Sequence, residues 1–295
     1  MVSANPAFNN PAFQDPRKTQ GATVGGQTAY TPPPAVDVAT QAQLEGAFAA
    51  PPAGARETGR MTIEDTVWKT VGLFAILVVT AVVGWIWSMS TVTAANPQPN
   101  IAPWLIGALG GFVLAMVISF SKKVRPPLIF AYAALEGLFV GSISAFFEYL
   151  FPGIVVQATL ATLSVVGVTL ALFASGKVRA SKRATKIWMI AMIGYLVFAP
   201  VNVVLMMFGA FPAGSAGAFG IYSVKVFGIP LGLLIGVFVV IMAAYSLVLD
   251  FDMIQQGVRN GAPRQFGWIG GFGIMVTVVW LYIEVLRILA IARSN

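Results

Sequence analysis

The sequence predicts an all-α polytopic membrane protein with seven transmembrane helices. Hydrophobic residues make up 57% of the 295-residue chain and charged residues only 10%, whereas an ordinary soluble domain carries about 25% charged residues. From residue 66 onward, apolar stretches of about 20 residues recur, and each is long enough to cross the roughly 30 Å hydrocarbon core of a bilayer. Short connections rich in Gly, Pro, Lys and Arg separate these stretches.

Residues 1–60 differ in composition from the rest of the chain. They are rich in Pro, Gly, Ala, Gln, Asn and Thr, and they hold too few large apolar groups to offset the entropy of ordering them. We therefore expect a disordered cytoplasmic tail in 1–60 and a seven-helix transmembrane domain in 61–295. The tail repeats the motif Asn-Pro-Ala-Phe at 5–8 and 10–13, which indicates either Asn-Pro turns or an exposed docking motif.

The helices can be placed in order along the chain. The first is expected to begin near Thr62, because Thr62 and Asp65 form an imperfect capping box with acids in the first turn. Turn or charge signals end each apolar stretch: NPQPN, SKKVRPP, FPG, SGKVRASKRATK, FPAGSAG and RNGAPRQ. Most of the Trp residues lie near these breaks, where amphipathic rings favour the membrane interface. The expected spans are 66–88, 101–120, 127–147, 154–174, 187–209, 226–250 and 267–291.

Lys and Arg are concentrated in alternate connections. The connections after the second, fourth and sixth spans carry the basic residues, whereas the opposite connections hold only Lys225. The positive-inside rule therefore places the N-terminus in the cytoplasm and, with seven spans, the C-terminus outside. This orientation explains the net charge of +7, and without a soluble basic domain we expect no nucleic-acid binding. The basic connections also suit contact with anionic membrane lipids.

The chain contains no His and no Cys. This composition excludes disulfides, thiolate or imidazole metal sites, and catalytic groups of the Ser-His-Asp or Cys-His type. Any chemistry must therefore use carboxylates, Lys, Arg, Tyr or the backbone.

Two acidic residues lie in apolar stretches at membrane depth, Asp250 in the sixth span and Glu284 in the seventh. A lone carboxylate in hydrocarbon is costly, so such groups normally face protein or a water-filled cavity and mark an ion or proton path. Asp250 shares a helix face with small residues, and Gly228, Gly232 and Gly236 form two successive GxxxG spacings that favour close helix packing. The alternative interpretation of Asp250 is a solvated acid at the cytoplasmic end of its helix.

Glu284 shares its helix face with Gly273 and Thr277, so it is also expected to point into the bundle. The alternative for Glu284 is a structural i,i+3 ion pair with Arg287. Asp252, by contrast, is turned about 160° away from Asp250 around the helix and fits a solvated position.

A third acid, Glu136, lies about ten residues into the third span, which is too deep for its side chain to reach water easily. An interhelical hydrogen bond and a role in transport are both compatible with this position. Lys69 and Lys225 lie near helix ends, where their side chains are expected to extend toward the membrane surface.

These motifs carry a resemblance to a known family. The run LDFDMIQ at the end of the sixth span and LYIEVLRIL in the seventh resemble the paired-acid signature of the Bax inhibitor family, also called the transmembrane Bax-inhibitor-motif family. The seven spans, the basic connection after the second and the run ALEGLFVGSIS are similar to a bacterial branch of that family with a long N-terminal tail. The resemblance covers about residues 62–295. It implies a multi-pass protein of the bacterial plasma membrane, with six helices around a central last helix.

The resemblance also implies a function without enzymatic activity or cofactor, a pH-sensitive calcium leak closed by an acidic pair. It implies that Asp250 takes the place of the family's acid in span 6 and that Glu284 takes the place of its Asp in span 7. Two close carboxylates can share one proton and close the path, and loss of that proton would separate the helices and attract Ca²⁺ to a weak site formed by both acids. At 1.5 Å per residue, straight spans would offset the two acids by roughly 10 Å. The pair therefore requires the connection between the spans to project into the cytoplasm.

The family's basic latch at the end of span 2 is usually Arg, and this chain offers Lys122 or Lys123 there, with Arg287 as a further candidate latch. Lys cannot make the bidentate carboxylate contact of Arg. Some bacterial relatives imply an alternative function, a regulatory protein that binds a membrane-bound protease or another membrane complex. An intramembrane aspartyl protease is disfavoured because the chain lacks a GxGD motif. A secondary transporter is disfavoured because the chain shows no repeated halves.

Overall fold

The computed structural model describes residues 55–94, 98–121, 123–211 and 219–294. Seven described helices are long and apolar enough to cross a membrane, which confirms the all-α polytopic fold expected from the sequence. They are α4 (Ile63–Met89), α5 (Ala102–Phe120), α6 (Pro126–Leu150), α7 (Ile154–Ala174), α8 (Lys182–Met207), α9 (Leu231–Arg259) and α10 (Gly267–Ser294). The short elements are α3 (Ala55–Thr58), η4 (Gly220–Ser223), β1 (Lys225–Val226), β2 (Ile229–Pro230) and η5 (Arg264–Phe266).

The sixth span is the one whose boundaries differ most from expectation. It starts at Leu231, after the antiparallel β1–β2 hairpin, and continues to Arg259. Gly228 lies in the hairpin turn with a φ of 80°, so its predicted GxxxG spacing on the helix is wrong. Only the spacing of Gly232 and Gly236 lies on α9.

Capping explains where two of the helices begin. The hydroxyl of Thr62 accepts a hydrogen bond from the backbone N–H of Asp65 at 3.2 Å, which confirms the predicted start of α4. The side chain of Glu148, near the end of α6, accepts hydrogen bonds from the N–H groups of Gly153 and Val155 at 2.6 and 3.0 Å. One carboxylate thereby closes the α6–α7 turn and satisfies the first N–H groups of α7.

The described part of the predicted tail is folded. The backbone of Gly59 accepts a hydrogen bond from Arg264 N–H at 2.8 Å, and Met61 N–H donates to the carbonyl of Ala262 at 2.7 Å. The chain before α4 therefore pairs with the α9–α10 connection. The rest of the predicted tail, including both Asn-Pro-Ala-Phe repeats, lies outside the described residues.

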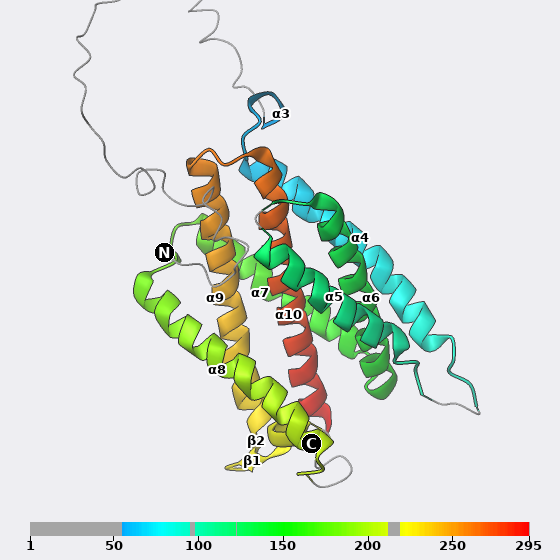
Figure 1. The fold of residues 1–295 in the computed structure, drawn as a ribbon. Coiled ribbons are helices and arrows are strands. Elements are labelled where there is room, and N and C mark those ends of the chain that lie inside the picture. The colour runs from blue at the N-terminus through cyan, green and yellow to red at the C-terminus, as the bar shows by residue number, and fades with distance from the viewer. Residues whose placement is uncertain (1–54, 95–97, 122, 212–218, 295) are drawn as a thin grey trace, which may run out of the picture.

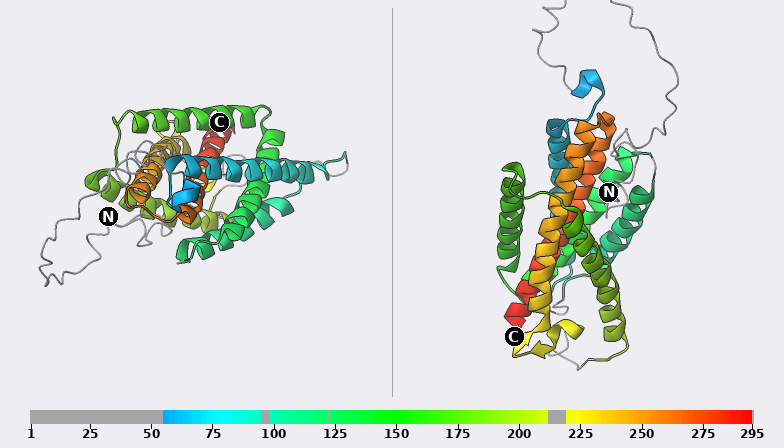
Figure 2. Two further views of the ribbon diagram at one scale, coloured as in Figure 1. Left: turned by 90° about the horizontal axis from the view of Figure 1, so that it is seen from above. Right: turned by 90° about the vertical axis from the view of Figure 1, so that its left-hand side faces the viewer.

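Helix α10 occupies the centre of the bundle, as Figures 1 and 2 show. It packs against α4, α6, α7 and α9, and buried side chains follow one another along its whole length. Helix α5 packs mainly on α6. Helix α8 differs from all the others because only Trp188 and Asn202 on it are buried.

Small residues bring the helices close together. A Cβ added at Gly107 of α5 would lie 2.5 Å from the backbone nitrogen of Phe139 on α6. Gly137 and Gly141 of α6 meet the backbone of α4 in the same way. Such contacts let helix backbones approach without intervening side chains, which is how helices in membranes gain packing energy.

Candidate functional site

Asp250 lies inside the bundle, on the face of α9 that meets α10. Its side chain is 4% exposed, and its Oδ2 accepts a hydrogen bond from the hydroxyl of Thr277 at 2.7 Å. Because α9 continues to Arg259, Asp250 does not stand at a solvated helix end. Asp252 is instead half-buried and accepts a hydrogen bond from Gln256 at 2.7 Å.

Glu284 is also buried, at 3% exposure, but it has different partners. Its Oε1 forms an ion pair with Arg287 on the same helix, and its Oε2 accepts a hydrogen bond from the hydroxyl of Tyr195 on α8 at 3.0 Å. The guanidinium of Arg287 also lies 3.8 Å from the ring centre of Tyr222, a cation–π contact. The i,i+3 pair that the sequence left open is therefore present.

The structure does not bring the two carboxylates together. Antiparallel packing places Gly236 of α9 against Ile288 of α10, and Asp250 against Thr277. Glu284 lies seven residues after Thr277, which corresponds to about 10 Å along the helix axis at 1.5 Å per residue. This is the offset expected for straight spans, and the residue of α10 that faces Asp250 is Thr277.

Apolar side chains separate the two levels. Ala243 and Leu247 of α9 and Leu281 of α10 are completely buried in one cluster. We call these three residues the apolar plug. In the register of α9 and α10, Leu247 and Leu281 lie between the level of Asp250 and the level of Glu284, and Ala243 lies about level with Glu284.

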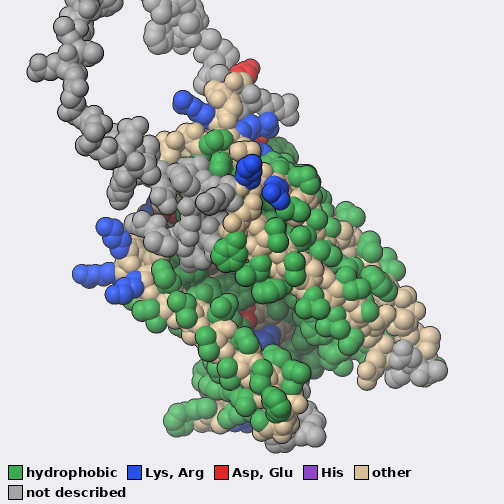
Figure 3. All heavy atoms as spheres, viewed as in Figure 1, with side chains coloured by type: hydrophobic (Ala, Val, Ile, Leu, Met, Phe, Trp, Pro, Cys, Tyr) green, Lys and Arg blue, Asp and Glu red, His purple; other side chains and the backbone are tan. Residues whose placement is uncertain are grey.

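Glu284 and Arg287 lie on the side of α10 that faces α8. Figure 3 shows an acidic and a basic side chain inside a hollow bordered by hydrophobic side chains. Helix α8 meets the neighbouring helices through a few polar bonds, including one of 2.9 Å from Trp188 Nε1 to the carbonyl of Met242. The second carboxylate is therefore covered by the most loosely packed helix of the bundle.

Glu136 belongs to a different interface. Its Oε2 would lie 3.0 Å from a Cβ added at Gly111, so the carboxylate faces α5. Its polar neighbour is Tyr132, one turn earlier on α6. The ring of Tyr132 packs edge-on against Phe272 of α10, with ring centroids 4.9 Å apart. The hydrogen-bond partner of Glu136 therefore lies on its own helix and not across an interface, and a role of Glu136 in transport stays a prediction.

Of the three candidate latches, Arg287 contacts an acid. Lys122 lies outside the described residues. Lys123 is exposed in the α5–α6 connection, where its backbone bonds to the hydroxyl of Ser121. The described contacts thus assign the basic partner of Glu284 to α10 itself.

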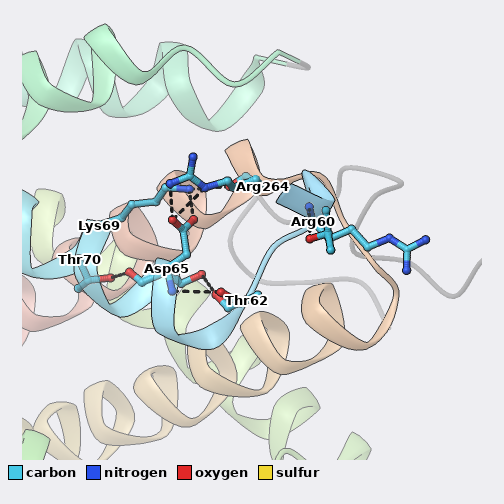
Figure 4. A network of polar contacts seen from close by, with 8 residues as sticks. Arg60, Thr62, Asp65, Lys69, Thr70 and Arg264 are labelled. Atoms are coloured by element: carbon cyan, nitrogen blue, oxygen red, sulfur yellow. Dashed lines mark hydrogen bonds and ion pairs between the residues drawn. The ribbon is translucent and has the colours of Figure 1, made fainter. Parts of the chain in front are cut away.

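A cluster that sequence reasoning missed joins the start of α4 to the α9–α10 connection (Figure 4). Asp65 Oδ1 accepts hydrogen bonds from Arg264 Nη2 and Nε at 2.6 and 3.0 Å, and Asp65 Oδ2 pairs with Lys69 Nζ at 2.5 Å. Lys69 also donates to the carbonyl of Arg264 at 2.6 Å and is 7% exposed. The expectation that Lys69 extends to the membrane surface is therefore wrong. The feature of the sequence that could have predicted part of this cluster is the i,i+4 spacing of Asp65 and Lys69, which favours an ion pair on a helix.

Among the residues that the structure describes, no three His, Cys, Asp or Glu side chains lie close enough together to hold a metal ion. Asp250 and Glu284 offer one carboxylate each, at different levels of the α9–α10 interface.

Comparison with known proteins identifies a family for this chain. A family model described as Bax inhibitor 1 like matches residues 5–294, which is nearly the whole chain. No curated protein and no solved structure matches the chain.

Proposed function

The chain belongs to the Bax inhibitor 1 like family, and from this premise we propose that it is a pH-sensitive leak channel for cations, with Ca²⁺ as the permeant ion. The observation that carries the proposal is the burial of Asp250 between two membrane-spanning helices, with a hydrogen bond from Thr277. A carboxylate inside the membrane is costly, and such residues usually mark an ion or proton path.

The mechanism we propose uses the two carboxylates in series. When Asp250 is protonated, it is neutral, and the Thr277 hydrogen bond suits the closed interface between α9 and α10. Loss of the proton leaves a buried charge beside one hydroxyl, and desolvation of that charge then favours separation of the helices and entry of water. The apolar plug must part for an ion to pass. The leak should therefore increase as the pH rises.

Glu284 provides the second cation-binding level. Its internal countercharge is Arg287, whose guanidinium also lies over the ring of Tyr222. A hard divalent cation prefers carboxylate and carbonyl oxygens and attracts Glu284 more strongly than a monovalent ion does. Displacement of Arg287 by the permeant ion therefore favours Ca²⁺ over Na⁺ in this proposal.

Ion flux in liposomes tests the function directly. Purified protein is reconstituted with a Ca²⁺ gradient, a Na⁺ gradient or no gradient, and flux is measured from pH 5 to pH 8. We expect Ca²⁺ flux that rises with pH and exceeds Na⁺ flux. Flux equal to that of empty liposomes at every pH contradicts the proposal.

The Asp250→Asn variant is expected to give a low Ca²⁺ flux that no longer depends on pH across the Asp250 transition. Asn keeps the shape of Asp and can still accept the bond from Thr277, but it does not titrate. Asp252→Asn is the matched control on the same helix and should keep the wild-type pH profile, because Asp252 bonds to Gln256 away from α10. A wild-type profile in Asp250→Asn would remove Asp250 from the mechanism and leave Glu284 and Glu136 to be tested.

We also propose that the protein lies in the bacterial plasma membrane with its N-terminus in the cytoplasm. The basic connections α5–α6, α7–α8 and α9–α10 alternate with connections that carry almost no basic residues. A reporter enzyme fused after Arg179 should be active in the cytoplasm, whereas one fused at the C-terminus should be active outside. Activity of both fusions on the same side contradicts this orientation.

A second candidate function is regulation of a membrane-bound protease or another membrane complex. The observation that favours it is α8, whose long apolar surface is almost entirely exposed in the bundle. Another transmembrane helix can pack on such a surface. Liposomes without measurable flux, together with a stable complex formed through α8, would favour this candidate over the leak.

A further inference from the structure

The turn of the β1–β2 hairpin carries an unusual residue. Phe227 and Gly228 both have positive φ angles, of 52° and 80°, as a two-residue type I′ turn requires. Such turns normally take Asn or Gly at the first position, because a Cβ is unfavourable there. Phe227 nevertheless occupies it, and its side chain is completely exposed.

The remaining residues of the hairpin differ in exposure, and each exposed residue lies opposite a less exposed one on the other strand. Pro230 is buried and Val226 is half-buried, whereas Lys225 and Ile229 are exposed. Among the described residues, Lys225 takes part in no ion pair. The hairpin therefore exposes two large apolar side chains, those of Phe227 and Ile229, and the ammonium group of Lys225.

The hairpin lies where the apolar part of α9 begins. Leu231, the first residue of the helix, donates a hydrogen bond to the carbonyl of Val224 at 2.8 Å, which fixes the hairpin to the helix start. Figure 1 shows the hairpin at the same end of the bundle as the C-terminus. In the proposed orientation this is the outer face, at the boundary between hydrocarbon and headgroups.

We propose that the β1–β2 hairpin is a membrane-surface anchor that inserts Phe227 and Ile229 into the outer lipid interface and places Lys225 among the lipid phosphates. Aromatic rings favour this interface, and a Lys side chain reaches from apolar surroundings to anionic headgroups. Contact with lipid explains why an exposed turn keeps a large apolar residue in a conformation that disfavours it. The anchor fixes the outer end of α9 and does not depend on the leak activity.

The absence of Cys from the chain makes the test direct. Phe227→Cys creates one attachment site for a nitroxide spin label in the full-length protein, reconstituted in nanodiscs of phosphatidylglycerol and phosphatidylethanolamine. Relaxation of the label by oxygen, which concentrates in lipid, is compared with relaxation by a water-soluble nickel chelate. Val237→Cys, on an exposed apolar position of α9, is the lipid control, and Lys177→Cys, exposed in the α7–α8 connection, is the water control.

We expect the label at 227 to be relaxed more by oxygen than by nickel, with a ratio closer to that at 237 than to that at 177. A ratio equal to that at 177 would place the hairpin in water and overturn the proposal. Shielding from both reagents would show a protein contact, with a second copy or another chain, and would also overturn it.

The lysine is tested separately. In nanodiscs with phosphatidylglycerol, Lys225→Gln should move the label at 227 toward water, whereas in nanodiscs of phosphatidylcholine alone the same change should have little effect. An equal shift in both lipids, or none in either, contradicts the phosphate contact of Lys225.

Discussion

Replacement of Arg287 by Met is expected to lower the free energy of unfolding by about 3–5 kcal/mol, because it leaves the buried carboxylate of Glu284 without its countercharge. The hydroxyl of Tyr195 remains as a hydrogen-bond donor, but one neutral donor does not replace an ion pair in a buried position. Unfolding by a denaturing detergent in mixed micelles at pH 8 measures the loss. The loss should shrink as the pH falls, because a proton on Glu284 removes the buried charge.

Two further variants separate the ion pair from general damage. Arg293→Met is the matched control, since Arg293 is exposed and donates to the backbone carbonyls of Phe151 and Pro152. It should cost no more than about 1 kcal/mol. The double change Glu284→Gln and Arg287→Met should recover most of the stability lost by Arg287→Met alone. Additive losses in the double variant would show that the ion pair does not couple the two residues.

The fold, and the side of α9 on which Asp250 lies, could be predicted from the sequence. The length of the apolar stretches and the charged residues that end them locate the membrane helices, because a helix must cross the hydrocarbon core with few or no charges in it. Helical phase predicts that Asp250 points toward a partner helix, and the Gly232–Gly236 face of α9 does pack on α10. Such features depend on positions within one helix, which a sequence records directly.

The partners of these residues were not predictable in the same way. The level at which α10 meets Asp250 is set by the length of α9 beyond Asp250 and by the short η5 turn before α10. This register, rather than local spacing, places Thr277 opposite Asp250 and leaves Glu284 with Arg287. Register is a tertiary property, and periodicity within α9 or α10 alone does not fix it.

Burial of Lys69 shows the same limit. A Lys near a helix end normally reaches water, but here the ammonium group of Lys69 donates a hydrogen bond to the carbonyl of Arg264, 195 residues away in sequence. Together with Asp65, this contact satisfies the ammonium group inside the protein. Only the folded chain brings these groups together.

The Gly141→Ala variant is expected to destabilise the protein by about 3 kcal/mol, at the upper end of the range for overpacked cores. Gly141 lies where α6 crosses α4, and an added Cβ would overlap the carbonyl oxygen of Ala81 and lie 2.7 Å from its Cα. These are backbone atoms of a helix, so they cannot turn aside as a side chain would. The two helices must move apart, which loosens the packing on both sides of α6.

Gly167→Ala on α7 provides the matched control, because nothing lies within 4 Å of a Cβ added there. In the middle of a helix, Ala is favoured over Gly by roughly 0.5–1 kcal/mol, so this variant should be neutral or slightly more stable. The same detergent titration compares both variants with the wild-type protein. Equal stability of the two variants would mean that α4 and α6 do not pack backbone to backbone at Gly141. A large loss in Gly141→Ala alone would show that a close glycine contact holds α4 against α6, the helix that carries Glu136.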